Sequence, residues 1–215
     1  MSLLKSNSVQ IGQSTTGTNN FTLSVPSSPD GTIKLARGNS GATTQDILSV
    51  NASGAVTLTN GGTITLGAVQ NSTSGTAIDF TGIPSWVKRI TVMFNEVSTN
   101  GTNQGLIQLG SGSFTTSGYT SQTVLVGATT ANNSGTDGMI WFNSGSTESH
   151  IGSFVITNIT GNTWVCTGLS RIAAQYISLS ASKVTISGAL DRVRITTAGG
   201  TDTFDAGSVN IMYEG

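Results

Sequence analysis

The stretch Val87-Lys88-Arg89-Ile90-Thr91-Val92-Met93-Phe94 decides the fold class of this chain. Within it, the apolar residues Ile90, Val92 and Phe94 occupy every second position. Successive side chains of a β-strand point to opposite faces of its sheet, so this period of two predicts a strand with one face on a core. The same period returns in the closing segment 209–213.

Short apolar segments of this kind recur along the chain and are separated by turns of Gly, Ser, Asn and Thr. No window of helical length shows a sustained period of 3.6 residues with end signals, and the short candidate 44–50 is assigned to loop or strand. Strands spaced in this way are typical of an all-β sandwich. The longer strands are expected at 87–94, 105–109, 123–126, 139–142, 153–159, 163–167, 176–180, 184–190, 192–196 and 209–213.

The composition of the 215-residue chain limits its partners. Charged residues make up 9% and the net charge is −1, which favours neither nucleic acid nor an anionic membrane surface as a partner. The first ten residues, MSLLKSNSVQ, lack a long apolar core, so neither a signal peptide nor membrane insertion is expected. We therefore expect synthesis in a cytoplasm.

Residues 1–67 and 68–215 differ in composition, and we expect them to form separate regions. The first contains no Trp or Tyr and a single Phe, Phe21, and its predicted strands are short. Such strands cannot bury enough surface within one chain to offset the entropy of ordering them, whereas three copies wound together can. The sequence thus predicts a homotrimer, with residues 1–67 as a stalk or attachment region and residues 68–215 as a head. The head is expected to be an antiparallel, jelly-roll-like β-sandwich.

Three segments resemble C-terminal regions of tailed-bacteriophage tail fibres and related receptor-binding virion proteins. They are Ser27–Gly38 (SSPDGTIKLARG), Ser74–Ile90 (SGTAIDFTGIPSWVKRI) and Leu190–Ile211 (LDRVRITTAGGTDTFDAGSVNI). The resemblance implies a trimeric, β-rich fibre in the virion tail, assembled in the host cytoplasm. It also implies contacts with other tail or baseplate proteins and with a glycan or protein of the host surface. The family carries no catalytic signature, and no binding residues transfer from it.

Three functions remain open. The first is a tail-fibre subunit that attaches the particle to a host, and the second is a purely structural fibre, baseplate linker or decoration protein. The third is a polysaccharide depolymerase, which needs two carboxylates across the sugar. The candidate pairs Asp202/Asp205 and Asp137/Glu148 lie in Gly-rich turns, and turn formation is the favoured explanation for them. We therefore expect a protein that is not an enzyme.

No cofactor or metal site is expected. The single histidine, His150, has only Glu148 near it in the sequence, and we interpret it as an exposed loop residue. The single cysteine, Cys166, lies in the apolar run Trp164-Val165-Cys166 and is expected to be a buried, inert thiol.

Receptor contact is predicted in the loops of the head, because loops on a rigid scaffold carry function. The candidate loops are 98–104, 128–138 and 143–149. Tyr119, in Ser117-Gly118-Tyr119-Thr120, is the candidate receptor-binding aromatic because it is predicted to lie exposed in a loop. Trp141 and Trp164 lie within predicted strands and are assigned to the core.

Overall fold

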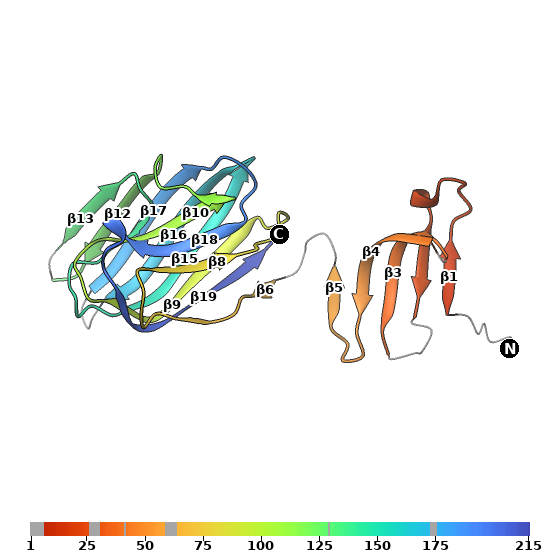
Figure 1. Ribbon diagram of the computed structural model, residues 1–215, viewed down its shortest axis with the longest axis horizontal. Coiled ribbons are helices and arrows are strands. Elements are labelled where there is room, and N and C mark those ends of the chain that lie inside the picture. The colour runs from red at the N-terminus through yellow and green to blue at the C-terminus, as the bar shows by residue number, and fades with distance from the viewer. Residues whose placement is uncertain (1–6, 26–30, 41, 59–63, 129, 173–175) are drawn as a thin grey trace. The chain divides into compact units, whose positions relative to one another are not determined.

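The computed structural model describes residues 7–25, 31–40, 42–58, 64–128, 130–172 and 176–215, and its sheets are antiparallel (Figure 1). The prediction of an all-β protein is confirmed. The chain divides into two compact units between residues 63 and 64, four residues before the predicted boundary. Residues 64–67 belong with the second unit because β6 (Thr65–Leu66) pairs with its last strand, β19 (Phe204–Glu214). The first four residues of the segment 27–38 lie outside the described residues.

The first unit is a single five-stranded sheet in which neighbours in sequence are neighbours in space. Its turns are held by amide side chains. Asn51 Oδ1 accepts hydrogen bonds from the backbone of Ser53 (3.0 Å) and Ala55 (2.9 Å), which closes the last hairpin. Its strands are β1 (Ser8–Ile11), β2 (Phe21–Ser24), β3 (Ile33–Asn39), β4 (Ala42–Val50) and β5 (Val56–Leu58).

This sheet has almost no core of its own. Within the described part of the unit, Ala36 is the one buried apolar side chain, at 2% exposed. The fully buried Asn20 is polar and fixes the loop before β2. Its side-chain nitrogen donates to the Ser14 carbonyl (2.8 Å) and to the Asn39 side chain (2.6 Å).

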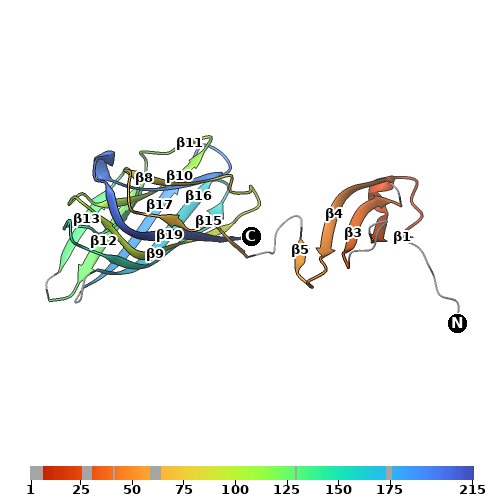
Figure 2. The ribbon, with the colours of Figure 1, turned by 60° about the horizontal axis from the view of Figure 1, so that its bottom comes forward.

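The second unit is a sandwich of two antiparallel sheets, which Figures 1 and 2 show as stacked layers. The nine-stranded long sheet has the order β13-β12-β17-β16-β15-β9-β19-β6, with β7 also paired to β19, and the short sheet has the order β11-β10-β18-β8, with β14 paired to β10. The long sheet contains β7 (Gln70–Asn71), β9 (Arg89–Thr99), β12 (Thr120–Val126), β13 (Ala131–Gly135), β15 (His150–Thr160), β16 (Thr163–Ile172) and β17 (Tyr176–Thr185), besides β6 and β19. The short sheet contains β8 (Ala77–Thr81), β10 (Gly105–Ser111), β11 (Ser113–Phe114), β14 (Met139–Trp141) and β18 (Arg192–Thr197).

The core lies between these two sheets and follows the period of two that the sequence shows. Ile90 and Val92 of β9 are fully buried, and Phe94 packs at 5.3 Å from Trp141 and 5.2 Å from Phe154, measured between ring centroids. Gly105 provides the room for this aromatic cluster, because a Cβ there would lie 1.7 Å from the Trp141 ring. The inward-facing pattern predicted for β9 is therefore confirmed.

Two sequence-based expectations differ from the structure. The segment 184–190 is not a separate strand: Val184 and Thr185 end β17, and the chain then turns toward β18 with Ile186 and Leu190 buried. Buried apolar residues in a turn resemble a strand in sequence. Conversely, the predicted loop 128–138, of which residue 129 lies outside the described residues, contains the strand β13. Its residues are polar because β13 is an edge strand paired only with β12.

The second unit should fold without the first, since its core lies entirely between its own sheets. We expect a fragment of residues 64–215 to show β-type circular dichroism and a cooperative thermal transition. A fragment of residues 1–63 at low micromolar concentration serves as the comparison and should melt without cooperativity, because its sheet buries so little. An unfolded 64–215 fragment would show that the unit boundary is wrong.

Candidate interaction surfaces

Tyr119 is buried, so its prediction as an exposed receptor-binding aromatic is wrong. The side chain is 2% exposed, and its hydroxyl oxygen accepts a hydrogen bond from the Leu109 backbone N–H (2.8 Å). The same hydroxyl donates to the Thr115 carbonyl (3.0 Å), and burial raises the pKa of the phenol to about 12. The ring can be buried because its polar end is satisfied by the backbone. Through these contacts, Tyr119 holds the segment between β10 and β12 against the core.

His150 is also buried, which corrects its prediction as an exposed loop residue. It begins β15, is 1% exposed, and lies edge-on to Trp141 with ring centroids 4.6 Å apart. Its Nε2 is 3.4 Å from Asn143 Oδ1, and burial lowers the pKa of the imidazole to about 4. No three His, Cys, Asp or Glu side chains gather into a metal-binding group in the part of the chain that the structure describes.

The remaining single-residue predictions for the core are confirmed. Trp141 and Trp164 are 0% and 3% exposed. Cys166 is 2% exposed, and burial raises the pKa of its thiol to about 12, which leaves it protonated and unreactive at neutral pH.

Two of the predicted tip loops, 98–104 and 143–149, are joined through Asn143, which is 1% exposed. The Asn143 side-chain nitrogen donates to the Asn103 carbonyl (3.0 Å) and lies 3.4 Å from the Gly101 carbonyl. Gln104 bonds back to the Asn143 backbone. These loops are therefore one fixed polar structure, a property that suits preorganised recognition.

The carboxylates weighed as catalytic candidates bond to their own surroundings. Asp202, at 8% exposed, accepts hydrogen bonds from the backbone (2.9 Å) and side chain (2.6 Å) of Asn103. Glu148 accepts from the backbone and hydroxyl of Ser144, both at 2.9 Å. Asp205 is exposed, and Asp137 lines a surface hollow that Arg194 also lines. Each of the two bonded carboxylates thus has a structural role in its loop.

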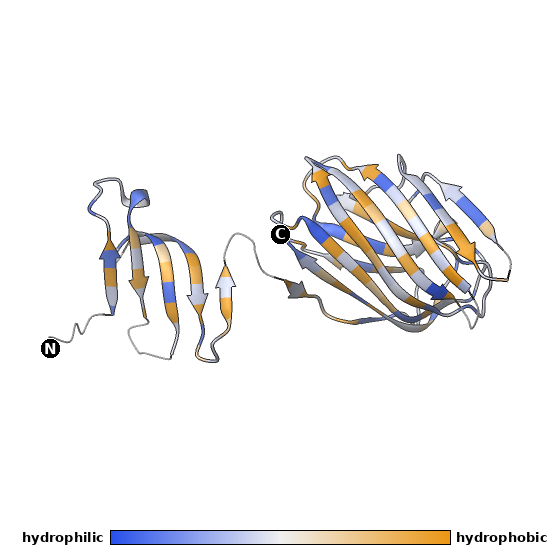
Figure 3. Ribbon diagram, turned by 180° about the vertical axis from the view of Figure 1, so that it is seen from behind, coloured by the Kyte–Doolittle hydropathy of each residue, from blue (hydrophilic) through white to orange (hydrophobic). Residues whose placement is uncertain are grey.

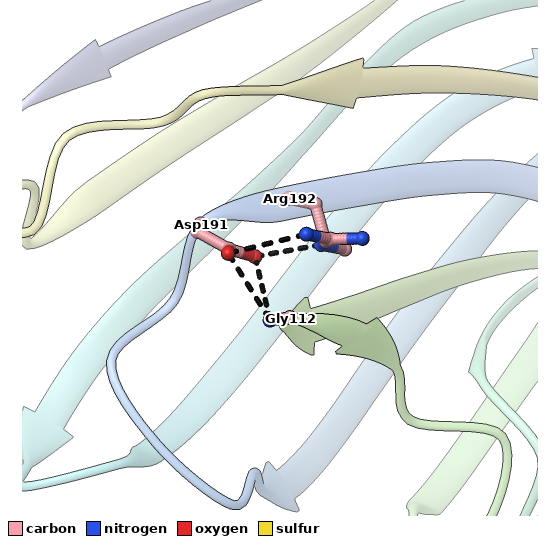
Figure 4. Close-up of polar contacts among 3 residues, drawn as sticks. All are labelled: Gly112, Asp191 and Arg192. Carbon is pink, nitrogen blue, oxygen red and sulfur yellow. Dashed lines mark hydrogen bonds and ion pairs between the residues drawn. The ribbon is translucent and has the colours of Figure 1, made fainter.

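The outer face of the short sheet is charged and internally paired. Arg194 forms a bidentate ion pair with Asp79, with both contacts at 2.7 Å, and stacks 4.1 Å from the Phe114 ring. Asp191 accepts hydrogen bonds from Arg192 and from the Gly112 backbone (Figure 4), and the bond from Arg192 is the main cause that lowers the pKa of this carboxyl. The charged side chains of this face therefore find their partners within the chain.

The first sheet, in contrast, carries an uncovered apolar face. Strand pairing places Val9, Leu23, Leu35, Leu48 and Leu58 side by side in one row across all five strands. The neighbouring row, one residue away along each strand, is Ser8, Ser24, Lys34, Ser49 and Thr57. Its side chains point to the opposite side of the sheet. We define the apolar face of the first sheet by the apolar side chains on the side of the leucine row: Val9, Ile11, Phe21, Leu23, Ile33, Leu35, Leu48, Val50, Val56 and Leu58.

None of these ten side chains is buried, and six of them are 37–57% exposed. Figure 3 shows the alternation of apolar and polar residues along these strands. Sequence reasoning identified the missing core of this region but not the row, because a row is defined by the pairing between strands. The sequence does contain one indication of the row: each strand has two apolar residues two positions apart, such as Ile33 and Leu35.

Fold and surfaces together define an all-β protein of two units, one a sandwich and the other a single-layer sheet with an exposed apolar side. No protein-family model matches the chain, and neither a curated protein nor a solved structure matches it. None of the helices among the described residues has the length and apolar character needed to cross a membrane.

The replacement Tyr119→Phe should destabilise the second unit by about 1–3 kcal/mol, because it leaves the buried Leu109 N–H and Thr115 carbonyl without a partner. The measurement is the free energy of unfolding from urea titration. Tyr213→Phe is the matched control, since the Tyr213 hydroxyl makes no hydrogen bond to a described residue, and it should change stability little. Equal effects of the two replacements would contradict the role given to Tyr119.

Stability should also fall in mild acid through His150. Its folded pKa of about 4 lies below the unfolded value of 6.5, so the unfolded chain binds more protons between these values. The stabilisation is complete above pH 6.5 and decreases by up to about 1.4 kcal/mol per pH unit as the pH falls toward 4. Urea titrations of the wild-type chain and of His150→Gln across this range measure the effect. The difference between the two should shrink toward low pH, and a pH-independent difference would refute the assignment.

Proposed function

We propose that the chain is a bacteriophage virion protein: a homotrimeric tail-fibre subunit that attaches the particle to the host surface. The observation that carries this proposal is the uncovered apolar face of the first sheet. In this proposal, the first unit is the stalk or attachment region and the second unit is a jelly-roll-like head.

An apolar sheet face is stable in water when another layer covers it. Full burial of one Val, Leu or Ile side chain contributes about 1.5–3 kcal/mol, so covering six that are 37–57% exposed provides several kcal/mol per copy. Other copies of the same sheet are a source of that cover, since their faces carry the same apolar side chains. The resemblance to phage fibres selects three copies over two.

Composition supports a particle component. With 9% charged residues, the chain relies on hydroxyl and amide groups for solubility, and such a surface changes little with ionic strength. The head offers the joined loops 98–104 and 143–149 as mostly uncharged polar contacts for a glycan or protein of the host surface. Three weak sites would act together through avidity.

One observation favours the second candidate, a purely structural linker or decoration protein. Every Trp, Tyr and Phe side chain within the described residues is buried or half-buried, so none is presented fully to a sugar ring. Receptor contact would then depend on polar groups alone. The test of function therefore has to separate attachment from scaffolding.

We expect mass photometry of the untagged chain at micromolar concentration to give three times 21.9 kDa. Leu35→Lys places a charge at the centre of the leucine row and should release monomers. Thr57→Lys, on the opposite side of the same sheet, is the matched control and should remain trimeric. A wild-type chain that is a stable folded monomer would refute the trimer.

Attachment is tested by competition. Purified trimer should reduce adsorption of the virus that encodes this chain to its host cells, and the Leu35→Lys chain should compete less because avidity is lost. Gold-labelled antibody against the second unit should decorate the tails of the particles. Labelled tails without competition would favour the linker role, and particles without label would refute both virion roles.

A further inference from the structure

The long sheet of the second unit also has an apolar outer side. Pairing between strands places Val126 beside Ile177, and Val124 beside Leu179, which in turn lies beside Leu169. Five of the outward aliphatic side chains are 39–52% exposed. We define the outer aliphatic patch by six residues on β12, β15, β16 and β17: Val124, Val126, Ile151, Leu169, Ile177 and Leu179.

The two outer faces of the sandwich differ in chemical character. The short sheet presents Arg194, Arg192 and Asp79, all engaged in ion pairs. An antiparallel sheet that faces water normally presents polar residues on its outer side. A contiguous group of exposed aliphatic residues in a folded unit instead marks an interaction site.

The charges around the patch indicate its partner. Arg171 pairs with both Ile151 and Ile177 across the sheet, and the exposed Lys183 lies on the same strand as Leu179. β12, β15, β16 and β17 contain no Asp or Glu. Neither cation forms an ion pair with another described residue.

The other half of the same long sheet has the opposite sign. Glu96 on β9 and Asp205 on β19 are both exposed, and neither forms an ion pair within the described part of the chain. One copy of the unit therefore presents unpaired cations and aliphatic groups on one half of the sheet and unpaired carboxylates on the other. Such a surface is complementary to a second copy of itself.

We propose that the outer aliphatic patch packs against the second unit of a neighbouring copy of this chain, on the half of its long sheet formed by β9 and β19. Arg171 faces Glu96 and Asp205 of that neighbour. The contact is heterologous, as a closed ring of three requires. This inference rests on the proposed trimer. Two proteins that associate freely bury about 800 Å² per partner. A smaller patch suffices here, because the trimeric first units already keep the second units near one another at about millimolar effective concentration.

Cysteine labelling in the full chain tests the contact. Leu179→Cys should react with a maleimide about tenfold more slowly in the trimer than in a chain that also carries Leu35→Lys, because contact shields the thiol. Leu58→Lys on the edge strand β5 is a second way to release monomers, should Leu35→Lys fail to fold. Thr81→Cys on the exposed side of the short sheet is the control, with equal rates in both states. The buried Cys166 of the wild-type chain provides the blank.

The outcomes separate this inference from the trimer. A wild-type monomer by mass refutes both, whereas a trimer in which Leu179→Cys reacts at the monomer rate overturns the inference alone. Slow labelling in trimer and monomer alike also overturns it, because the chain itself would then cover the patch.

Charge exchange tests the identity of the facing surface. In the Leu179→Cys trimer, Arg171→Glu should raise the labelling rate toward the monomer value. Adding Glu96→Lys and Asp205→Lys to the same chain should restore the slow rate. A rate that stays high after the exchange would overturn the proposed facing surface.

Discussion

Covering the apolar side of a β-sheet is the constraint on which the rest of this structure depends. A strand that alternates apolar and polar residues gives its sheet one side that must be removed from water. The second unit meets this constraint internally, because its two sheets bury Ile90, Val92, Ile107 and Ile195 against one another. The first unit has the same alternation but a single sheet, and the apolar side of its described residues stays exposed.

The turns and loops of this chain depend on amide side chains and glycines more than on charged side chains. Asn20, Asn51 and Asn143 each bind two or more backbone groups, and these bonds hold the turns and loops in which they lie. Four ion pairs occur among the described residues, all of them partly exposed, and exposed pairs contribute only about 0–1 kcal/mol each. Loop order in this protein is therefore expected to depend little on salt.

The elements that sequence reasoning predicted are those decided by local pattern. Strand β9 and the buried Trp141, Trp164 and Cys166 follow from the period of two and from apolar neighbours in the sequence. Tyr119 does lie in the loop that Ser117-Gly118 indicates, but its expected exposure was wrong. Its burial depends on the Leu109 N–H of another strand, which is a tertiary contact.

His150 was misplaced for the same reason. Polar neighbours in the sequence indicated a loop, whereas Trp141 and Asn143 enclose the ring in space. The leucine row of the first sheet and the outer aliphatic patch of the second unit also depend on register. A shift of one residue between paired strands would move half of each group to the other side of its sheet. The candidate surfaces therefore required the pairing, even though each strand shows its alternation in the sequence.

The edges of the long sheet are poorly suited to adding a strand from another chain. An edge strand with free backbone groups can add a strand from another chain, and polar residues on that strand weaken such addition. The long sheet ends at β13, whose sequence Ala131-Asn132-Asn133-Ser134-Gly135 has low β-propensity and little apolar surface. At the other end the sheet is bordered by the two-residue strands β6 and β7, which offer few free groups. With a polar strand at one edge and two-residue strands at the other, the long sheet disfavours open-ended growth by strand addition.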